Sequence, residues 1–341
     1  MFLSDSNSIC YFMAGESRAK TCVVIFSSWG LRAIGGKVGG TNPLLRLGYD
    51  VVSVQSNCDD WHQGLPPHAV DTLRIFLRDH YQEVHGYGSS MGAYAAIAFG
   101  RIFNFRKILA LSPQYRIDQP FDQRWQNDAR RITWRYTMDA ACCLQDGQIF
   151  IVYDPLHLDA LHVEKMKALL SAASLELLPL KYSAHPSTFW LDAAGVLKDL
   201  LGSVFQRGEY GLNVRALRMG NPVHLREVGK KLLVHKKYAW SVYWLEKSLA
   251  CGGRTMDTLG ILSSAQALMG RSDAAVATRL SALEACQTDA QRVGQLYHLT
   301  RLFRSLGRKE EAMEAVEQAI AISPPHSGLV AERNSVVAMK V

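Results

Sequence analysis

The chain has 341 residues, 48% of them hydrophobic, which suits a globular protein of two domains, and no segment approaches the roughly 18 uninterrupted apolar residues of a membrane span. Its formal net charge is +7, but Lys and Arg are scattered and form no basic block or finger motif, which argues against nucleic-acid binding. The seven cysteines include the adjacent Cys142 and Cys143 but no Cys-x-x-Cys pair, so we expect buried free thiols and no zinc site.

Residues 1–205 alternate short β-branched runs with longer helical runs. The strand candidates are 8–13, 21–28, 50–55, 83–88, 107–112, 148–154 and 175–182, and helix-length segments lie near 64–80, 91–103, 160–173 and 187–206. This alternation predicts an α/β fold with a mostly parallel sheet covered by helices on both faces. The first two strands are joined only by AGESRAK, too short for a crossover helix, so we expect an antiparallel hairpin at one edge.

The segment HGYGSSMGAYAA (85–96) contains Gly88-x-Ser90-x-Gly92 between a strand-like run and a helix-like run. A G-x-S-x-G turn in this position holds a nucleophilic serine in a strained, exposed geometry, and its glycines allow a sharp turn and a close approach of strand and helix. The alternative is that the small residues serve packing alone. The strand-turn-helix context favours the nucleophile.

A serine hydroxyl needs a base to become a nucleophile, and candidates follow two later strands. Asp154 ends QIFIVYD, and His185 lies just beyond LELLPLKY. In this order of serine, acid and histidine, residues 1–205 resemble the α/β-hydrolase superfamily. The resemblance implies Ser90 as nucleophile, His185 as general base and Asp154 as the acid that orients the imidazole.

The same resemblance leaves two details of the site open. Asp159 is an alternative acid, although it also suits an N-cap of the helix that follows. The oxyanion hole is expected to use the backbone N–H of Met91 and a second donor from Ser28 or Trp29, after the strand TCVVIFSS.

Residues 113–147 separate two strands at the position where α/β-hydrolases carry a cap over the pocket. Arginine forks bind carboxylate or phosphate, and indole rings stack on sugars or acyl chains. The expected pocket residues are Arg116, Trp125 and Trp134 from this segment, with Trp61 and His62 from SNCDDWHQ. The alternative is that the tryptophans form the cap core and the arginines are solvated. The segments NCDDWHQ, GYGSSMGAYAA and LALSPQYRID are also similar to bacterial hydrolase-like proteins of polysaccharide or glycoprotein modification, which implies an acylated carbohydrate.

Residues 207–222 form a predicted linker, and 223–341 are helical and repetitive. Residues with the same spacing recur in three places: Lys236, Ser241 and Ser248; Gly270, Ala275 and Ala282; Gly307, Ala312 and Ala319. Such a period indicates stacked pairs of antiparallel helices. Residues 291–324 closely resemble a tetratricopeptide repeat, closed by Pro324, and 225–290 resemble degraded copies. The resemblance implies a protein partner or self-association.

These patterns predict a serine hydrolase that cleaves a carboxylic ester through an acyl-serine intermediate, with no metal and no cofactor. An acyltransferase to a sugar acceptor and a non-catalytic adaptor that acts through its repeats are the alternatives. The N-terminal segment MFLSDSNSICYFMAGESRAK lacks the basic start, apolar stretch and cleavage site of a signal peptide, so we expect a cytoplasmic location.

Overall fold

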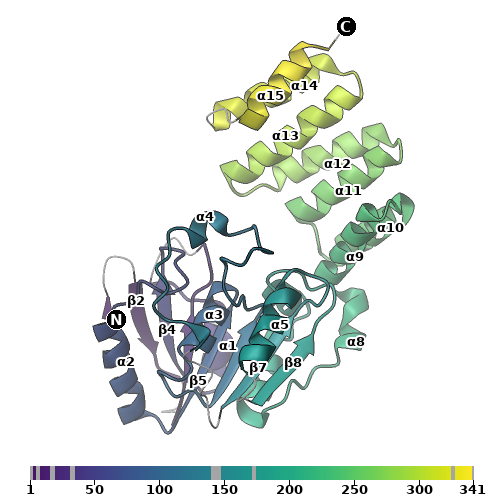
Figure 1. Cartoon of the computed structure of the whole chain (residues 1–341). Helices are drawn as coiled ribbons and strands as arrows, with labels where there is room; N and C mark the ends of the chain where they lie inside the picture. The colour runs from purple at the N-terminus through teal and green to yellow at the C-terminus, as the bar shows by residue number, and fades with distance from the viewer. Residues whose placement is uncertain are drawn as a thin grey trace. The chain divides into compact units, whose positions relative to one another are not determined.

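The computed structural model describes residues 3–4, 8–15, 20–30, 35–139, 147–170, 174–323 and 327–339. The chain divides into two compact units, Met1–Leu217 and Arg218–Val341 (Figure 1). Cys142, Cys143 and Pro324 lie outside the described residues. Among the described helices, none combines the length and the apolar character needed to cross a membrane.

Within the described part of the chain, the first unit is built on an eight-stranded sheet in the order β1-β2-β4-β3-β5-β6-β7-β8. The strands are β1 (Leu3–Ser4), β2 (Ser8–Met13), β3 (Thr21–Phe26), β4 (Asp50–Ser56), β5 (Glu83–Ser89), β6 (Lys107–Leu111), β7 (Gln148–Tyr153) and β8 (Ser174–Pro179). β3 to β8 run parallel, whereas β1 and β2 pair antiparallel. This is the strand order of the α/β-hydrolase fold, and burial on both faces explains the continuous apolar runs of the central strands.

The hairpin expected between the first two strand candidates is wrong, because β2 pairs with β4 rather than with β3. A skipped strand opens a gap of about 10 Å, which is two spacings of about 4.8 Å, and seven residues reach up to about 23 Å. The connection AGESRAK is therefore too short to contain a crossover helix, but it is long enough to pass one strand of the sheet. Gly15 lies where the chain passes β4: its N–H donates to Asp50 Oδ1 at 2.7 Å, and a Cβ there would meet Tyr49 O at 2.8 Å.

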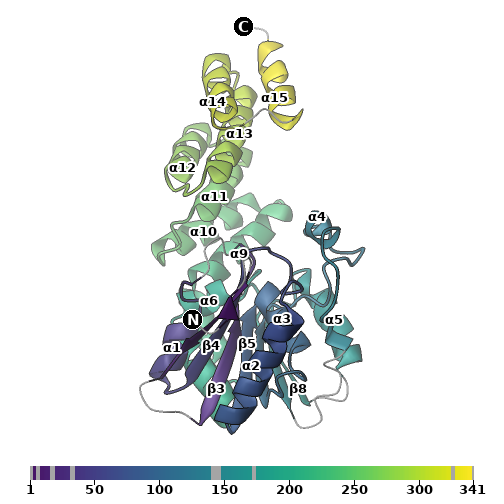
Figure 2. The ribbon, with the colours of Figure 1, turned by 90° about the vertical axis from the view of Figure 1, so that its left-hand side faces the viewer.

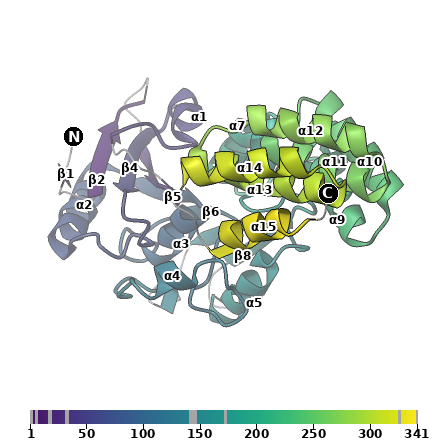
Figure 3. The ribbon, with the colours of Figure 1, turned by 90° about the horizontal axis from the view of Figure 1, so that it is seen from above.

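Helices cover both faces of the sheet, as Figure 3 shows from above. One face carries α2 (Pro67–His80), α3 (Met91–Ala98) and α5 (Asp159–Leu169), whose apolar side chains join the main core. On the other, α1 (Thr41–Arg46) packs against α7 (Leu197–Gly202). The single helix expected near 187–206 is divided into α6 (Thr188–Ala193), α7 and the π-helical turn η2 (Ser203–Arg207), with Gly195 at φ 69° between α6 and α7.

The segment between β6 and β7 contains one short described helix, α4 (Gln126–Ala129), and turns. In Figures 1 and 2, α4 lies beyond the carboxyl ends of the parallel strands, where a cap is expected. Residues 140–146 of the expected cap are outside the described part.

The cysteines differ in exposure. Cys10 and Cys22 are buried in strands, as expected, whereas Cys58 and Cys251 are exposed. The expectation of a buried thiol is therefore wrong for Cys58 and for Cys251, the residue that follows the helix ending at Ala250.

The second unit is a stack of antiparallel helix pairs (Figure 2). Its helices are α9 (Pro222–Val234), α10 (Tyr238–Ala250), α11 (Met256–Leu268), α12 (Ser272–Glu284), α13 (Asp289–Ser305), α14 (Lys309–Ile322) and α15 (Ser327–Val337), preceded by α8 (Val214–Leu217) and η3 (Arg218–Gly220). The first residue of each recurring triplet, Lys236, Gly270 and Gly307, has a positive φ in the turn between paired helices. The other triplet residues are fully buried Ser or Ala. The spacing therefore marks one turn and two close helix contacts per repeat, as in tetratricopeptide-like repeats.

Candidate active site

Ser90 lies at the sharp turn between β5 and α3. Its backbone has φ 54° and ψ −118°, a conformation that costs a non-glycine residue about 1–3 kcal/mol. The turn is held by the Ser90 N–H, which donates to Leu111 O of β6 at 2.9 Å. The flanking glycines are required by space: a Cβ on Gly88 would lie 2.1 Å from Gly92 O, and one on Gly92 would lie 2.3 Å from Phe26 O. Strand and helix therefore approach closely enough to present the Ser90 hydroxyl at the sheet edge.

The hydroxyl of Ser90 meets the imidazole of His185, which follows β8. Ser90 Oγ and His185 Nε2 lie 2.8 Å apart. On the opposite side of the ring, His185 Nδ1 is 2.6 Å from Asp159 Oδ2. The structure thus brings together a hydroxyl, an imidazole and a carboxylate in one chain of hydrogen bonds, from three separate connections of the sheet.

The carboxylate in this chain is Asp159 and not Asp154, so the preference for Asp154 is corrected. Asp154 Oδ1 accepts from Leu156 N at 2.9 Å, and its Oδ2 accepts from Ala184 N at 3.0 Å. Asp154 therefore holds the loops after β7 and β8 in place. Asp159, the first residue of α5, makes no side-chain cap there, and its fully buried carboxylate faces His185.

The pKa values of the two carboxyls are also shifted in opposite directions. Burial opposes ionisation of Asp159, but hydrogen bonds from His157 and His185 outweigh it and hold the pKa of this carboxyl below its usual range. Burial raises the pKa of Asp154, and backbone N–H groups offset only part of the shift. Asp159 is therefore the carboxyl that stays ionised beside the imidazole.

A network around Asp159 was not foreseen from the sequence. Arg124 Nη2, from the segment before β7, lies 3.0 Å from Asp159 Oδ1 and 2.7 Å from Asp122 Oδ2. Asp122 Oδ2 is also 2.9 Å from His162 Nε2, and both of these side chains are fully buried. His162 is thus a buried structural residue. No periodic pattern marks these contacts, which join residues about 35 to 40 positions apart.

Donors for a negatively charged oxygen flank Ser90. Met91 is the first residue of α3, where backbone N–H groups have no partner within the helix. Ser28 and Trp29 both line the cavity in front of Ser90, and the Ser28 hydroxyl donates to Ser89 O at 3.0 Å. Of the residues expected for an oxyanion hole, Ser28 and Trp29 therefore lie on the described wall of this cavity, and Met91 directly follows Ser90 in the chain.

That space is a cavity of about 280 Å³. Ser90, His185, Trp29, Trp125, Tyr87 and Phe189 contribute to its wall. Most ligand cavities of drug-sized molecules measure about 300–1,000 Å³, so this one suits a small group. Because much of its wall is aromatic, the cavity suits a group that is also apolar.

Of the five residues expected to line the pocket, Trp125 alone lies on the described wall of this cavity. Trp61 is fully buried behind it, with ring centroids 5.5 Å apart. His62 is buried with Nε2 3.0 Å from Ser27 O. Arg116 pairs with Asp118 and lies over the Trp134 ring, 5.4 Å from its centroid, away from Ser90. None of these four residues therefore contributes to the described wall of this cavity, because each side chain packs against, or pairs with, other residues of the first unit.

One group of described residues has the ligand types of a metal site: His157, Asp159 and His185, with ligand atoms all within 4.8 Å of one another. Each of these atoms already has a partner in the group, since His157 Nδ1 lies 3.2 Å from Asp159 Oδ1. The Arg124 guanidinium occupies the same carboxylate. A cation would have to displace both contacts.

No protein-family model matches the sequence, and no curated protein matches it. Among solved structures, the chain is similar to the capsule O-acetyltransferase of Neisseria meningitidis serogroup A, with 13% identity, 60% of this chain and 93% of that chain covered, and a TM-score of 0.45. It is similar to an esterase of Pyrococcus furiosus, with 15% identity, 58% and 86% covered, and a TM-score of 0.40. It is also similar to MamA, with 19% identity, 35% and 77% covered, and a TM-score of 0.30.

Proposed function

We propose that this chain is a serine hydrolase that cleaves a carboxylic ester, with Ser90 as nucleophile, His185 as general base and Asp159 as the acid. The observation that carries the proposal is the continuous hydrogen-bond chain, 2.8 Å from Ser90 Oγ to His185 Nε2 and 2.6 Å from His185 Nδ1 to Asp159 Oδ2. Both distances are within the reach required of a nucleophile, its base and the group that orients the base.

The first half of the reaction forms an acyl-enzyme. His185 Nε2 takes the proton of the Ser90 hydroxyl as Oγ attacks the ester carbonyl carbon. The carbonyl oxygen gains the negative charge and receives a hydrogen bond from the Met91 N–H. When the carbon–oxygen bond to the alcohol breaks, the imidazolium returns its proton to the departing oxygen. Asp159 stabilises the imidazolium and fixes which ring nitrogen carries the proton.

The second half returns the enzyme to its starting state. His185 takes a proton from water as the water oxygen attacks the acyl carbon, and the Ser90 oxygen leaves with that proton. The released product is a carboxylic acid. The small, aromatic cavity in front of Ser90 supports a short acyl group such as acetyl as the part of the substrate that is held there.

Acyl transfer to a sugar is the second candidate, because it needs the same acyl-enzyme and a different acceptor. The supporting observation is Trp29, which lines the cavity and is 42% exposed. An exposed indole face next to the acyl group is a surface on which a sugar ring stacks. In this case a sugar hydroxyl takes the place of water in the second half of the reaction.

We infer that the helical repeats bind a protein partner or a second copy of the chain, whichever acceptor the first unit uses. Stacked helix pairs of this kind present an extended binding surface. The purely non-catalytic adaptor is the least favoured alternative, since a scaffold without chemistry does not require the buried Asp159 to be ionised beside His185.

Labelling with a fluorophosphonate probe tests the nucleophile, and Ser89 provides a matched control. The Ser89 hydroxyl neighbours Ser90 but lies 2.6 Å from Thr188 Oγ1 instead of an imidazole. We expect full-length wild type and Ser89→Ala to be labelled and Ser90→Ala to remain unlabelled. Equal labelling of Ser90→Ala and wild type contradicts the proposal.

Acyl transfer is separated from hydrolysis by following p-nitrophenyl acetate with and without a methyl glycoside. Transfer predicts faster p-nitrophenol release and an acetylated sugar in the products. Hydrolysis predicts acetate as the product and a rate independent of the sugar.

A further inference from the structure

The second helix of the first repeat, α10, has a row of aromatic side chains exposed to solvent. Trp240, Tyr243 and Lys247 follow one another at intervals of three and four residues, so they lie on one side of the helix. Trp240 is 61% exposed and Tyr243 is 43% exposed, and their ring centroids are 5.9 Å apart. A different side of α10 packs into the repeats through buried residues: Ser241, Leu245 and Ser248. The two exposed rings are therefore not part of the core of this unit.

The two later repeats do not have these rings. Trp240 and Tyr243 lie four and seven residues after the first residue of their triplet. At the same positions the later repeats have small residues in one copy, Ala274 and Ala277, and acidic residues in the other, Glu311 and Glu314. The repeat architecture therefore does not require an aromatic side chain at either position, and the rings need another explanation.

Lysines lie beside the two rings. Residues 230–247 contain five Lys and one Glu, and Lys236 and Lys237 are both exposed immediately before α10. The first turn of α10 has no acidic residue, so these lysines add to the positive end of the helix dipole. The Lys247 ammonium lies 5.3 Å from the centroid of the Tyr243 ring. In the part of the chain that the structure describes, no carboxylate pairs with Lys236, Lys237 or Lys247.

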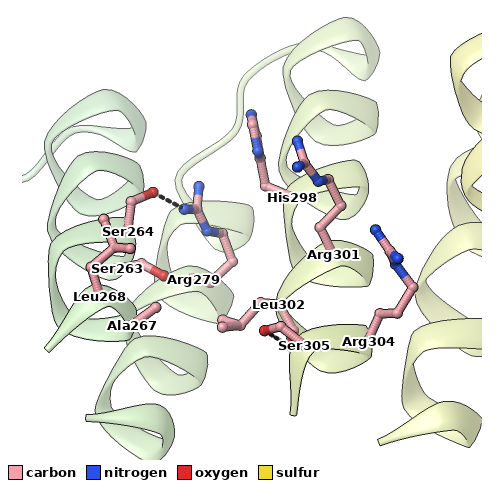
Figure 4. Close-up of a pocket in the computed structure, with 10 residues that line it drawn as sticks. All are labelled: Ser263, Ser264, Ala267, Leu268, Arg279, His298, Arg301, Leu302, Arg304 and Ser305. Atoms are coloured by element: carbon pink, nitrogen blue, oxygen red, sulfur yellow. Dashed lines mark hydrogen bonds between the residues drawn. The ribbon is translucent and has the colours of Figure 1, made fainter. Parts of the chain in front are cut away.

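The arginines of the second unit are placed elsewhere. Residues 230–247 contain none, whereas Arg279, Arg301 and Arg304 line a cavity of about 370 Å³ between α11 and α13 (Figure 4). The fork of an arginine suits one anion of fixed geometry, whereas a lysine ammonium is a point charge on a flexible stem. The lysines beside α10 therefore suit a surface with dispersed negative charge better than a single ion of defined shape.

We propose that the basic-aromatic patch, formed by Lys236, Lys237, Trp240, Tyr243 and Lys247, binds the surface of a membrane that contains anionic lipids. Trp and Tyr rings favour the headgroup region because one end of each ring is apolar and the other forms hydrogen bonds. The negative surface potential of anionic lipids attracts lysines that lie close to it. The membrane contact goes beyond the proposed ester chemistry and does not depend on it.

Two other occupants fit the basic-aromatic patch less well. In a symmetric dimer formed through this patch, the lysines of one copy would face the lysines of the other, and like charges repel. A single-stranded nucleic acid also stacks on aromatic rings, but its recognition draws on arginine, which residues 230–247 lack.

The test is co-sedimentation of the full-length protein with vesicles made of equal parts of phosphatidylcholine and phosphatidylserine, compared with vesicles of phosphatidylcholine alone. We expect the anionic vesicles to bind at least about tenfold more tightly, because each lysine near such a surface contributes about fivefold. Lys237→Gln should weaken this binding about fivefold, and combining it with Lys236→Gln should weaken it about 25-fold. Trp240→Ala should weaken it by about tenfold or more, because the exposed ring is lost.

Arg271→Gln is the matched control for charge, because Arg271 is exposed at the corresponding position before α12. Leu280→Ala is the control for loss of an exposed apolar side chain from the same unit. Both should bind like wild type, as should Ser90→Ala, which separates the membrane contact from the proposed ester chemistry. Thermal unfolding verifies that each variant is folded.

Three outcomes would overturn the proposal. One is equal binding of the two kinds of vesicle. Another is that the control variants weaken binding as much as Lys237→Gln and Trp240→Ala do. The third is that Trp240→Ala leaves vesicle binding unchanged but abolishes a dimer in solution or the binding of a single-stranded DNA, which would assign the basic-aromatic patch to that occupant instead.

Discussion

Arg124 and Asp159 form an ion pair that joins the segment between β6 and β7 to the first residue of α5, with Arg124 Nη2 3.0 Å from Asp159 Oδ1. The other carboxylate oxygen, Oδ2, faces His185. This segment, the expected cap, therefore supplies both Trp125 on the wall of the cavity and the arginine that pairs with the proposed acid.

Replacing Arg124 with Gln should lower kcat for p-nitrophenyl acetate by about 10- to 100-fold, because a hydrogen bond to a charged group contributes about 1.5–3 kcal/mol. Without the guanidinium, the buried carboxylate has fewer donors to fix its orientation toward His185. Arg130→Gln removes an exposed arginine of the same segment and should leave kcat unchanged. Equal activity of Arg124→Gln and wild type would show that the ion pair is irrelevant to positioning.

Asp159→Asn should lower kcat by about ten-thousandfold, the loss found when an amide replaces the acid of a serine triad. The amide cannot stabilise the imidazolium and favours the wrong tautomer. Asp154→Asn should instead lower the melting temperature, because Asp154 accepts backbone N–H groups of two loops, with a smaller loss of kcat. If Asp154→Asn were folded and the less active of the two, the assignment of the acid would be reversed.

Gly88→Ala should destabilise the first unit by at least about 3 kcal/mol, the upper part of the usual range for overpacking. Its Cβ would lie 2.1 Å from the backbone oxygen of Gly92, and neither strand nor helix can move aside without losing the turn at Ser90. Gly36→Ala meets no atom within 4 Å and is the control. Urea unfolding measures both, and wild-type stability of Gly88→Ala would contradict the packing at this turn.

Trp125→Ala should change which acyl chains are accepted. Removing this indole enlarges the wall of the cavity, so kcat/KM for p-nitrophenyl butyrate relative to acetate should rise about tenfold or more, as each methylene in an apolar pocket is worth about 1–3 kcal/mol. Trp134→Ala removes a tryptophan that contacts Tyr94 and Arg116 instead, and the ratio should stay as in wild type. An unchanged ratio for Trp125→Ala would place the acyl group elsewhere.

The stability of the first unit should fall in acid. Burial opposes ionisation of Asp122, but hydrogen bonds from Arg124 and His162 prevail and depress the pKa of this carboxyl, as the histidines do for Asp159. A depressed folded pKa gives stability that is present above the unfolded value of about 3.9 and is lost as the pH falls toward the folded value. In urea unfolding, Asp122→Asn should therefore be less stable than wild type at pH 7, and the difference should narrow from pH 5 to pH 3. A constant difference would mean that Asp122 acts through packing alone.

The sequence predicted the elements of the site better than their contacts. The turn at Ser90 and the positions of His185 and the acid after later strands follow from chain order, because parallel strands bring their carboxyl ends to one edge. The choice between Asp154 and Asp159 depends on the conformation of a few loop residues, and loops have no periodic sequence pattern from which it could be predicted. The contact between Asp122 and His162 could not be predicted for the same reason, because it joins an irregular segment to a helix. The predicted neighbour of β2 was wrong, because the length of a connection limits how far the chain can reach but does not determine which strand it pairs with.

The described wall of the cavity at Ser90 consists of residues of the first unit, the last of which is Phe189. The proposed chemistry is therefore encoded in little more than the first half of the polypeptide. Sequence change in the helical repeats can accumulate without altering a single atom of the reacting groups, so recognition of a partner and turnover of a substrate are open to separate evolutionary histories.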